Sequence, residues 1–131
     1  MKKTLCFVFA MICPAAGTLF AHHSFQAEYD RNQAVTVQGS VKEFEWTNPH
    51  ARLYVDSRDD HGQVATWNFE LGSPNILRRM GWNKESLHPG DAVTVEGYRA
   101  KDGSNLANAR KVTTADGKQV FAGSSAEHSD Q

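Results

Sequence analysis

Apolar and polar residues alternate with a period of two along most of the chain, and this pattern limits the possible folds more than any other feature. Successive side chains of a strand point to opposite faces, so the alternation predicts strands with one buried face. It occurs over residues 35–41, 51–56, 65–71 and 93–98, and more weakly over 107–113. The sequence therefore predicts an all-β domain with five main strands, in which Trp67 falls on the inward parity of the third.

The first of these runs changes phase in its middle. Its apolar positions up to Val41 share one parity, whereas Phe44 and Trp46 fall on the other. An extra residue near Lys42 produces such a change, because a bulge bends a strand and re-aims its second half. With Gly39 just before the change, we expect one continuous, bent first strand that pairs on both sides of the bend.

A short helix is predicted between the third and fourth strands. Ser73 is suited to be its N-cap, Pro74 its first helical position and Gly81 its stop. Residues 84–87 are expected to add another helical turn before residues 89–91 (Pro-Gly-Asp) turn the chain.

Turn-forming residues punctuate the remaining runs. Residues 59–62 join the second and third strands as a hairpin, and Asp116-Gly117 predicts a small hairpin near the end. Three strands, a short helix and two further strands are typical of a small OB-like β-barrel. A β-sandwich or a different small barrel is the alternative.

The first 21 residues have the pattern of a secretory signal. Lys2 and Lys3 precede an apolar run over residues 4–12, and Ala21 offers a small residue before the cut, with cleavage after Gly17 as the alternative. The run is too short for a membrane-spanning helix, which needs about 20 apolar residues. We expect a signal peptide over 1–21, an OB-like barrel domain over 22–122, a disordered tail over 123–131, and a periplasmic or secreted location.

Removing this signal would change the chemistry that the chain can offer. Both cysteines, Cys6 and Cys13, lie within it, so the processed chain would have no disulfide, thiolate metal site or cysteine nucleophile. Two of the 14 basic residues also lie within it, so the 15 acidic residues leave a net charge of about −3. That balance argues against nucleic acid or an anionic membrane as the partner.

The chain resembles a family of bacterial secreted proteins known as a domain of unknown function. The resemblance rests on residues 22–25 (HHSF), 46–50 (WTNPH), 70–74 (ELGSP), 81–82 (GW), 89–98 (PGDxVxVxGY) and 105–110. It covers nearly all of the processed chain. It implies export and a small β-barrel domain, and it implies no established activity.

No pattern in the chain favours an enzyme. It has no nucleophile elbow, no zinc-protease helix motif, no P-loop and no dinucleotide-binding fingerprint. Glu43 and Glu45 are expected on a solvated strand face. Glu70 ends an otherwise apolar run, where we expect a carboxylate on the rim of the barrel, with a buried acid as the alternative. The pattern therefore favours a binding protein whose ligand is a small molecule or a protein partner.

Four aromatic residues are candidates for contact with a ligand. OB barrels bind ligands on a surface that carries aromatic side chains. Tyr54 and Tyr98 fall on the outward parity of their strands, and Trp46 and Trp82 stand at the ends of elements. The alternative is that Trp46 and Trp82 pack into the ends of the barrel and close them.

The doubled histidine at the predicted cleavage site suggests a metal. After cleavage at Ala21, His22 would carry a free amine, and this amine chelates one ion together with its own Nδ1. A second imidazole, from His23 or His50, would complete three nitrogen ligands, a set that suits Cu(II). Phe25 and Tyr29 are expected to pin the leading segment to the barrel. The alternative is a flexible histidine tail, with His50 as an ordinary turn residue.

Overall fold

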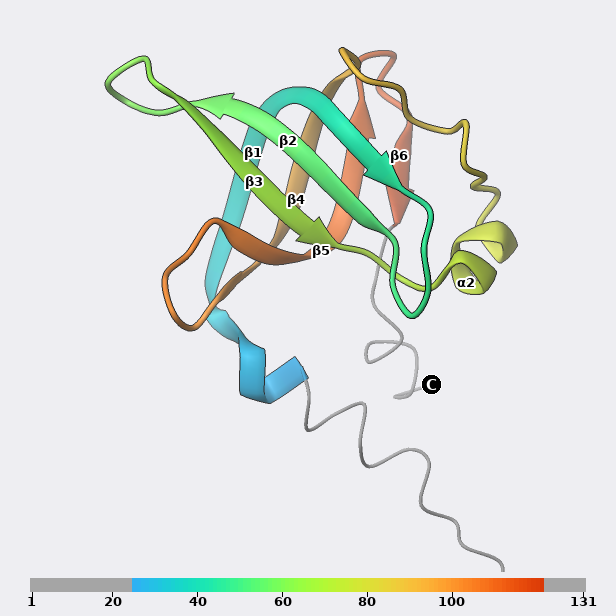
Figure 1. The fold of residues 1–131 in the computed structure, drawn as a ribbon, viewed down its shortest axis with the longest axis horizontal. Coiled ribbons are helices and arrows are strands. Elements are labelled where there is room, and N and C mark those ends of the chain that lie inside the picture. Colours follow the sequence, from blue (N-terminus) through green and yellow to red (C-terminus); the bar gives the residue numbers. More distant parts are fainter. Residues whose placement is uncertain (1–24, 122–131) are drawn as a thin grey trace, which may run out of the picture.

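The structure is a computed structural model, and it describes residues 25–121. After a helical turn over residues 25–28, the chain forms six strands and one short helix (Figure 1). Their bounds are β1 Tyr29–Glu45, β2 Arg52–Arg58, β3 Val64–Glu70, α2 Pro74–Arg79, β4 Ala92–Ala100, β5 Leu106–Thr114 and β6 Gln119–Phe121. The predicted signal peptide, His22, His23 and the predicted tail lie outside the described residues.

Five strands close into a ring. β1 pairs with both β2 and β4, β2 pairs with β3, and β4 pairs with β5, all antiparallel. A short parallel pairing of β3 with β5, from Asn68↔Leu106 to Glu70↔Asn108, completes the circle. β6 pairs with a later part of β5, residues 111–113, and extends the same sheet. This order, with one helix between β3 and β4, is that of an OB-type barrel, and it confirms the predicted fold class.

The bend of β1 is confirmed in the place that the phase change predicted. β1 pairs with β4 as far as Ser40 and with β2 from Ser40 onward, and the β2 register shifts between Val41 and Glu43. Gly39 allows the two strands to cross closely, because a Cβ there would lie 2.2 Å from the carbonyl oxygen of Asp56. One 17-residue strand thus belongs to two parts of the barrel wall.

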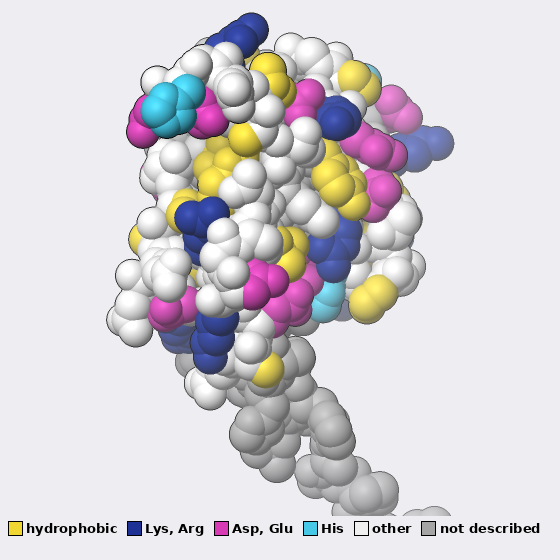
Figure 2. Space-filling view, turned by 60° about the vertical axis from the view of Figure 1, so that its left-hand side comes forward, with side chains coloured by type: hydrophobic (Ala, Val, Ile, Leu, Met, Phe, Trp, Pro, Cys, Tyr) yellow, Lys and Arg dark blue, Asp and Glu magenta, His cyan; other side chains and the backbone are white. Residues whose placement is uncertain are grey.

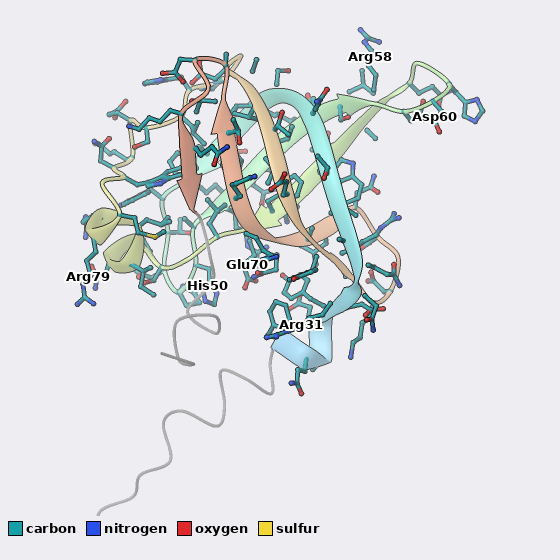
Figure 3. The ribbon with its side chains drawn as sticks, turned by 180° about the vertical axis from the view of Figure 1, so that it is seen from behind. Arg31, His50, Arg58, Asp60, Glu70 and Arg79 are labelled. Atoms are coloured by element: carbon teal, nitrogen blue, oxygen red, sulfur yellow. The ribbon has the colours of Figure 1, made fainter. Side chains whose placement is uncertain are left out.

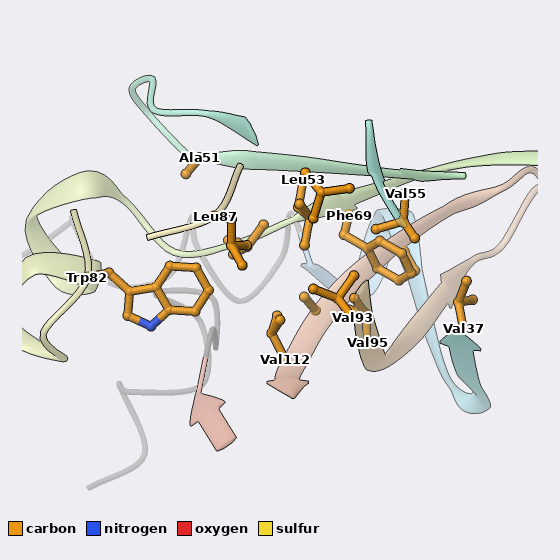
Figure 4. Close-up of a cluster of buried hydrophobic side chains, with 14 of the residues drawn as sticks. Val37, Ala51, Leu53, Val55, Phe69, Trp82, Leu87, Val93, Val95 and Val112 are labelled. Atoms are coloured by element: carbon orange, nitrogen blue, oxygen red, sulfur yellow. The ribbon is translucent and has the colours of Figure 1, made fainter. Parts of the chain in front are cut away.

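The core fills the barrel along its length. Leu53, Val55 and Phe69 from β2 and β3 meet Val95 and Val112 from β4 and β5, all of them fully buried (Figure 4). Trp82, which follows α2, is 4% exposed and lies at one end of this cluster. The residues that the alternation predicted to face inward are therefore the residues that form the core.

The helix α2 is built as its capping residues predicted. Ser73 Oγ accepts a hydrogen bond from the Ile76 backbone N–H at 3.3 Å, and Leu77 is buried beneath the helix. Gly81 follows the helix with φ +88°, a conformation that glycine adopts without strain. No helix within residues 25–121 is long and apolar enough to cross a membrane.

The prediction of a further helical turn over residues 84–87 is wrong. A hydrogen-bonded turn stands there, closed by the Ser86 backbone N–H donating to the Asn83 carbonyl at 3.0 Å. Asn83 Oδ1 also accepts from the Glu85 backbone N–H, and Ser86 Oγ accepts from the Asn83 backbone N–H. These side chains satisfy the backbone locally, and so they compete with a continuing helix.

Candidate functional site

The carboxylate of Glu70 is buried at the end of β3. Glu70 is 9% exposed, and its Oε2 accepts a hydrogen bond from the Tyr29 hydroxyl at 3.0 Å. Arg52 Nη2 lies 3.5 Å from the same oxygen. The expected rim position is therefore wrong, and the alternative of a buried acid is correct. In β3, the side chain of Glu70 points away from the core of the barrel. It is buried because a segment of the chain packs against the outside of the barrel at this position.

His50 lies beside this carboxylate. Its Nδ1 is 3.5 Å from Glu70 Oε1, and Figure 3 shows the two side chains together at one end of the barrel. The backbone explains the meeting, because Ala51 donates to the Gly72 carbonyl at 3.0 Å and accepts from the Leu71 N–H at 2.9 Å. These two hydrogen bonds hold the segment of His50 and the segment of Glu70 side by side.

The segment that covers Glu70 is the start of the described chain. Phe25 and Tyr29, 5% and 2% exposed, form a small cluster with Ala100 apart from the main core. The Phe25 ring lies 5.4 Å from the Tyr29 ring and 6.2 Å from the Tyr98 ring, measured between centroids. Phe25 and Tyr29 thus hold the leading segment on the barrel, as the sequence predicted.

The environment of Tyr29 keeps its hydroxyl protonated. Burial raises the pKa of the Tyr29 phenol well above its ordinary value, and the nearby charges of Glu70 and Glu28 raise it further. A neutral phenol is a hydrogen-bond donor, so this shift and the hydrogen bond to Glu70 agree. The contact is therefore a neutral donor facing a carboxylate, held out of water.

Asn108 is a second buried polar residue at the same place. It is 0% exposed, and it stands opposite Glu70 in the β3–β5 pairing and opposite Tyr98 in the β4–β5 pairing. Neither its Nδ2 nor its Oδ1 has a hydrogen-bond partner among residues 25–121. A buried amide left in this state costs free energy, and so this position is unusual for a side chain that serves packing alone.

The two tryptophans among the aromatic candidates meet at the end of the barrel near α2. Phe44 lies between them, with ring centroids 5.8 Å from Trp46 and 5.8 Å from Trp82. The Arg78 guanidinium of α2 stands 5.7 Å from the Trp46 ring centroid. Trp82 is buried and Trp46 packs against the core, so the arrangement is that of the alternative interpretation, in which they close one end of the barrel.

The two tyrosines lie elsewhere and do not meet. Tyr54 donates to Glu45 Oε2 at 3.5 Å on the outside of β1 and β2. Tyr98 contacts the Phe25 cluster, and the Arg110 guanidinium stands 5.2 Å from its ring centroid. The four aromatic candidates therefore do not form one ligand-binding surface.

A wide hollow lies where β1 and the β2–β3 hairpin diverge. It has a volume of about 1070 Å³, and its walls are residues 36–40 of β1 and residues 56–60 at the end of β2. Trp67 and Arg99 also line it, with the Arg99 guanidinium 5.2 Å from the Trp67 ring centroid. Arg99 is fixed by bonds to the Ser104 carbonyl at 2.9 Å and to Asn105 Oδ1 at 3.2 Å.

Sequence reasoning missed this hollow because it assigned Trp67 to the closed core. The inward parity of Trp67 is correct, since its partner in the sheet is the buried Val55 and its ring stacks on Phe69 at 5.9 Å. Trp67 is nevertheless only partly buried, because β1 turns away from β2 beyond Asp56. On the face drawn in Figure 2, hydrophobic side chains occur in small groups among charged and polar ones.

The described residues alone do not make a metal centre. No group of three or more histidine, aspartate or glutamate side chains within residues 25–121 is arranged to hold an ion. Of the three histidines predicted as ligands, His50 is placed beside Glu70, and His22 and His23 precede the described part of the chain.

Comparison with known protein families identifies the family of this chain. A model for a family of unknown function, DUF6152, matches residues 10–109. The chain belongs to DUF6152. The matched region contains His22, His50 and Glu70. A search of the curated proteins found no match.

One similar solved structure is the mitochondrial single-stranded DNA-binding protein Rim1 of S. cerevisiae. It is 15% identical, the match covers 63% of this chain and 93% of that chain, and the TM-score is 0.49. At that identity and score the likeness carries no ligand over to this DUF6152 member, whose fold follows from its own strand order.

Proposed function

We propose that this DUF6152 member is an exported binding protein, not an enzyme, and that its ligand is Cu(II) held by His22 and His50. The supporting observation is a series of contacts that leads from the start of the described chain to His50. Phe25 packs on Tyr29, Tyr29 donates to Glu70 at 3.0 Å, and Glu70 lies 3.5 Å from His50.

The length of the leading segment suits this assignment. His22 stands three residues before Phe25, and three residues span at most about 11 Å when fully extended. Phe25 is buried against the barrel, and the proposal requires His22 to lie within this distance of it. A longer or unanchored leader would lack this restraint.

The donor set determines the metal. Cleavage after Ala21 gives His22 an amine, which forms a chelate with its own Nδ1, and the His50 imidazole supplies a third nitrogen, with His23 as the other candidate. Nitrogen ligands in a tetragonal arrangement suit Cu(II), and imidazole is neutral and able to bind near neutral pH. The processed chain has no thiolate to compete for the metal.

The test uses the processed protein, purified after export, with its N-terminus established by intact mass. Cu(II) is titrated by calorimetry, and the bound form is characterised by electron paramagnetic resonance. Two variants remove the proposed ligands, namely one added alanine before His22 and His50→Ala. We expect each to lower the affinity at least tenfold and to change the spectrum.

His61→Ala is the matched control, since His61 is exposed in the turn of the β2–β3 hairpin. It should bind Cu(II) as the parent protein does. Equal affinity for the parent, the extended form and His50→Ala would refute the copper proposal.

A second candidate ligand is an oligosaccharide, favoured by the hollow beside Trp67 and Arg99. OB barrels bind oligosaccharides with the β2–β3 face and the adjacent loops. The hollow combines one aromatic ring with carboxylate, guanidinium and amide groups, and it carries Asp56, Asp59 and Asp60 as well as Arg58 and Arg99. This mixture of signs suits a neutral polar ligand better than a polyanion.

Chitohexaose, cellohexaose and maltohexaose are suitable probes, followed by amide and indole NMR shifts. We expect shifts confined to the Trp67 indole, Arg99 and residues 36–40, and we expect them to disappear in Trp67→Ala. Shifts at none of these positions with any of the three sugars would exclude this ligand class.

A further inference from the structure

We propose that a pocket between the end of α2 and the turn from β5 to β6 binds a small organic acid, one whose carboxylate is joined to a compact apolar group. This pocket, the Trp82 pocket, has a volume of about 160 Å³. Its apolar walls are Met80, Trp82 and Leu87, and its polar walls are Ser86, Thr114 and Lys118. It shares no residue with the proposed copper site or with the hollow beside Trp67, so it is independent of both proposals above.

Two local structures hold the walls of the pocket in place. Where α2 ends, the Trp82 backbone N–H donates to the Leu77 carbonyl at 2.9 Å, a bond that closes the helix and fixes where the indole leaves it. In the turn after β5, the Thr114 backbone N–H donates to the Lys118 carbonyl at 3.1 Å, and the Gly117 N–H donates to the Thr114 carbonyl at 2.9 Å. The polar and apolar walls therefore keep their places without a ligand, as a binding site requires.

The size and the apolar walls of the pocket limit the ligand. Leu87 and Trp82 are 3% and 4% exposed and belong to the main core, and Met80 packs against it. An apolar cavity of about 150 Å³ holds a benzene ring. A pocket of about 160 Å³ therefore accepts one six-membered ring or a branched chain of similar size, and it is too small for a disaccharide or a nucleotide.

The indole nitrogen of Trp82 is the feature that points to a ligand. Nε1 is buried and has no hydrogen-bond partner among residues 25–121. An indole N–H can only donate, and a buried one usually has an acceptor. In Figure 4 the nitrogen lies on the edge of the ring that is turned away from Ala51 and Leu53. Since Trp82 lines the pocket, a ligand there can supply the acceptor that the side chain lacks.

Met80 is the part of the wall that can adjust to a ligand. Trp82 Nε1 is out of contact with water, and so a ligand must displace part of the wall to reach it. Met80 is only partly buried, and its unbranched side chain has three rotatable bonds, so it changes shape at little cost. The pocket thus combines fixed polar groups with one movable apolar side.

The polar groups of the pocket are donors, and one of them is positively charged. Lys118 is exposed, and it is the one charged side chain among the described residues that line the pocket. Ser86 Oγ accepts from the Asn83 backbone N–H at 2.8 Å, which leaves its hydroxyl proton to donate. Asp116 does not line the pocket, and its carboxylate already accepts from the Thr114 hydroxyl and the Lys118 backbone N–H. An indole, a hydroxyl and an ammonium group together suit a carboxylate.

The experiment titrates benzoate into isotope-labelled protein, purified as for the copper titration, and follows the NMR spectrum. We expect the Trp82 indole N–H resonance and the methyl resonances of Met80 and Leu87 to shift together and to saturate. The binding energy per atom that is usual for small ligands corresponds to a Kd of about 10 mM or lower for a molecule of this size. Benzamide has the same shape without the charge, and it should bind about fivefold more weakly.

Two lysine variants test the source of this preference. Lys118→Gln removes the charge of the pocket, and we expect it to lower the affinity for benzoate about fivefold, to that of benzamide. Lys84→Gln is the matched control, because Lys84 is exposed in the segment beside the pocket and does not line it. The control should prefer benzoate to benzamide as the parent protein does.

Three results would overturn the proposal. The first is a Trp82 indole resonance that does not respond to benzoate, or shifts at Trp67 and Arg99 in its place. The second is an equal loss of affinity in Lys118→Gln and Lys84→Gln, or no loss in either, since the charge of the pocket would then have no part in binding. The third is 1-naphthoate, whose two fused rings exceed the pocket, binding as tightly as benzoate.

Discussion

Tyr29 and Glu70 are joined by a hydrogen bond of 3.0 Å although 41 residues separate them in the sequence. The bond fastens the first residue of β1 to the last residue of β3, on the outside of the barrel. It is the contact that converts an outward-facing strand carboxylate into a buried one.

This bond makes the stability of the protein sensitive to alkaline pH. The pKa of Tyr29 is raised in the folded state, so the folded protein keeps the phenolic proton when the unfolded chain has lost it. The stabilisation is complete below the ordinary tyrosine pKa of about 10 and is lost progressively as the pH rises above it. We expect the free energy of unfolding to fall above pH 10 more steeply in the parent than in Tyr29→Phe. Urea unfolding at pH 8 to 11 measures this, and identical slopes would contradict it.

Gly39 should tolerate no side chain. A Cβ at this position would lie 2.2 Å from the Asp56 carbonyl oxygen and 2.9 Å from a methyl group of Val55. Gly39→Ala must therefore separate β1 from β2 at the bend, and we expect a loss of about 1–3 kcal/mol or more in unfolding free energy, as for other overpacked sites. Gln38→Ala, one residue earlier and exposed, should cost far less. Equal values from chemical denaturation would mean that the strands do not cross as described.

Trp67 and Phe69 should differ in their contribution to stability, although they share one face of β3. Phe69 is fully buried, so Phe69→Ala should cost about 3–5 kcal/mol. Trp67 is only partly buried beside the hollow, so Trp67→Ala should cost less, about 2 kcal/mol, which is below the range that applies to a tryptophan in a closed core. Denaturant unfolding of both variants checks the order, and a larger loss at Trp67 would mean that the mouth of the barrel is closed.

Asn108 should be replaceable by leucine with little loss of stability. Its amide is buried without a partner among residues 25–121, and removing an unsatisfied polar group of similar shape is near neutral or stabilising. We expect the melting temperature of Asn108→Leu to equal or exceed that of the parent. Asn68→Leu is the comparison, because it breaks a bond to Arg52. A clear destabilisation at Asn108 would indicate a bound water or ligand at the amide.

The features that the sequence predicted correctly are the local ones. Alternation identifies strands because the period of two is a property of a single segment, and the shifted parity of Phe44 located the bulge for the same reason. The capping residues Ser73 and Gly81 likewise act within one turn of the chain. None of these inferences needed to know which distant segment lies beside which.

The burial of Glu70 and the position of the hollow depend on such distant segments. Glu70 has the parity of a solvated residue, and only the packing of Phe25 and Tyr29 over the outside of the barrel removes it from water. The spacing of Phe25 and Tyr29 was a usable signal, since two large aromatic residues, one just before β1 and one at its first position, need a surface to cover. Nothing in the sequence indicated that the surface would be the end of β3.

The parallel pairing that closes the barrel also affects the order in which the protein folds. β3 and β5 meet over three residue pairs, and β5 is almost the last strand along the chain. The hairpin of β2 and β3 can form early from neighbouring residues, whereas this seam must wait until residues 106–108 have been synthesised and have found a strand that lies far back in the sequence. Glu70 and Asn108 are partners in that seam. The pairing that brings Glu70 and Asn108 together can thus form only once β5 is present, so a chain truncated before β5 would lack the site.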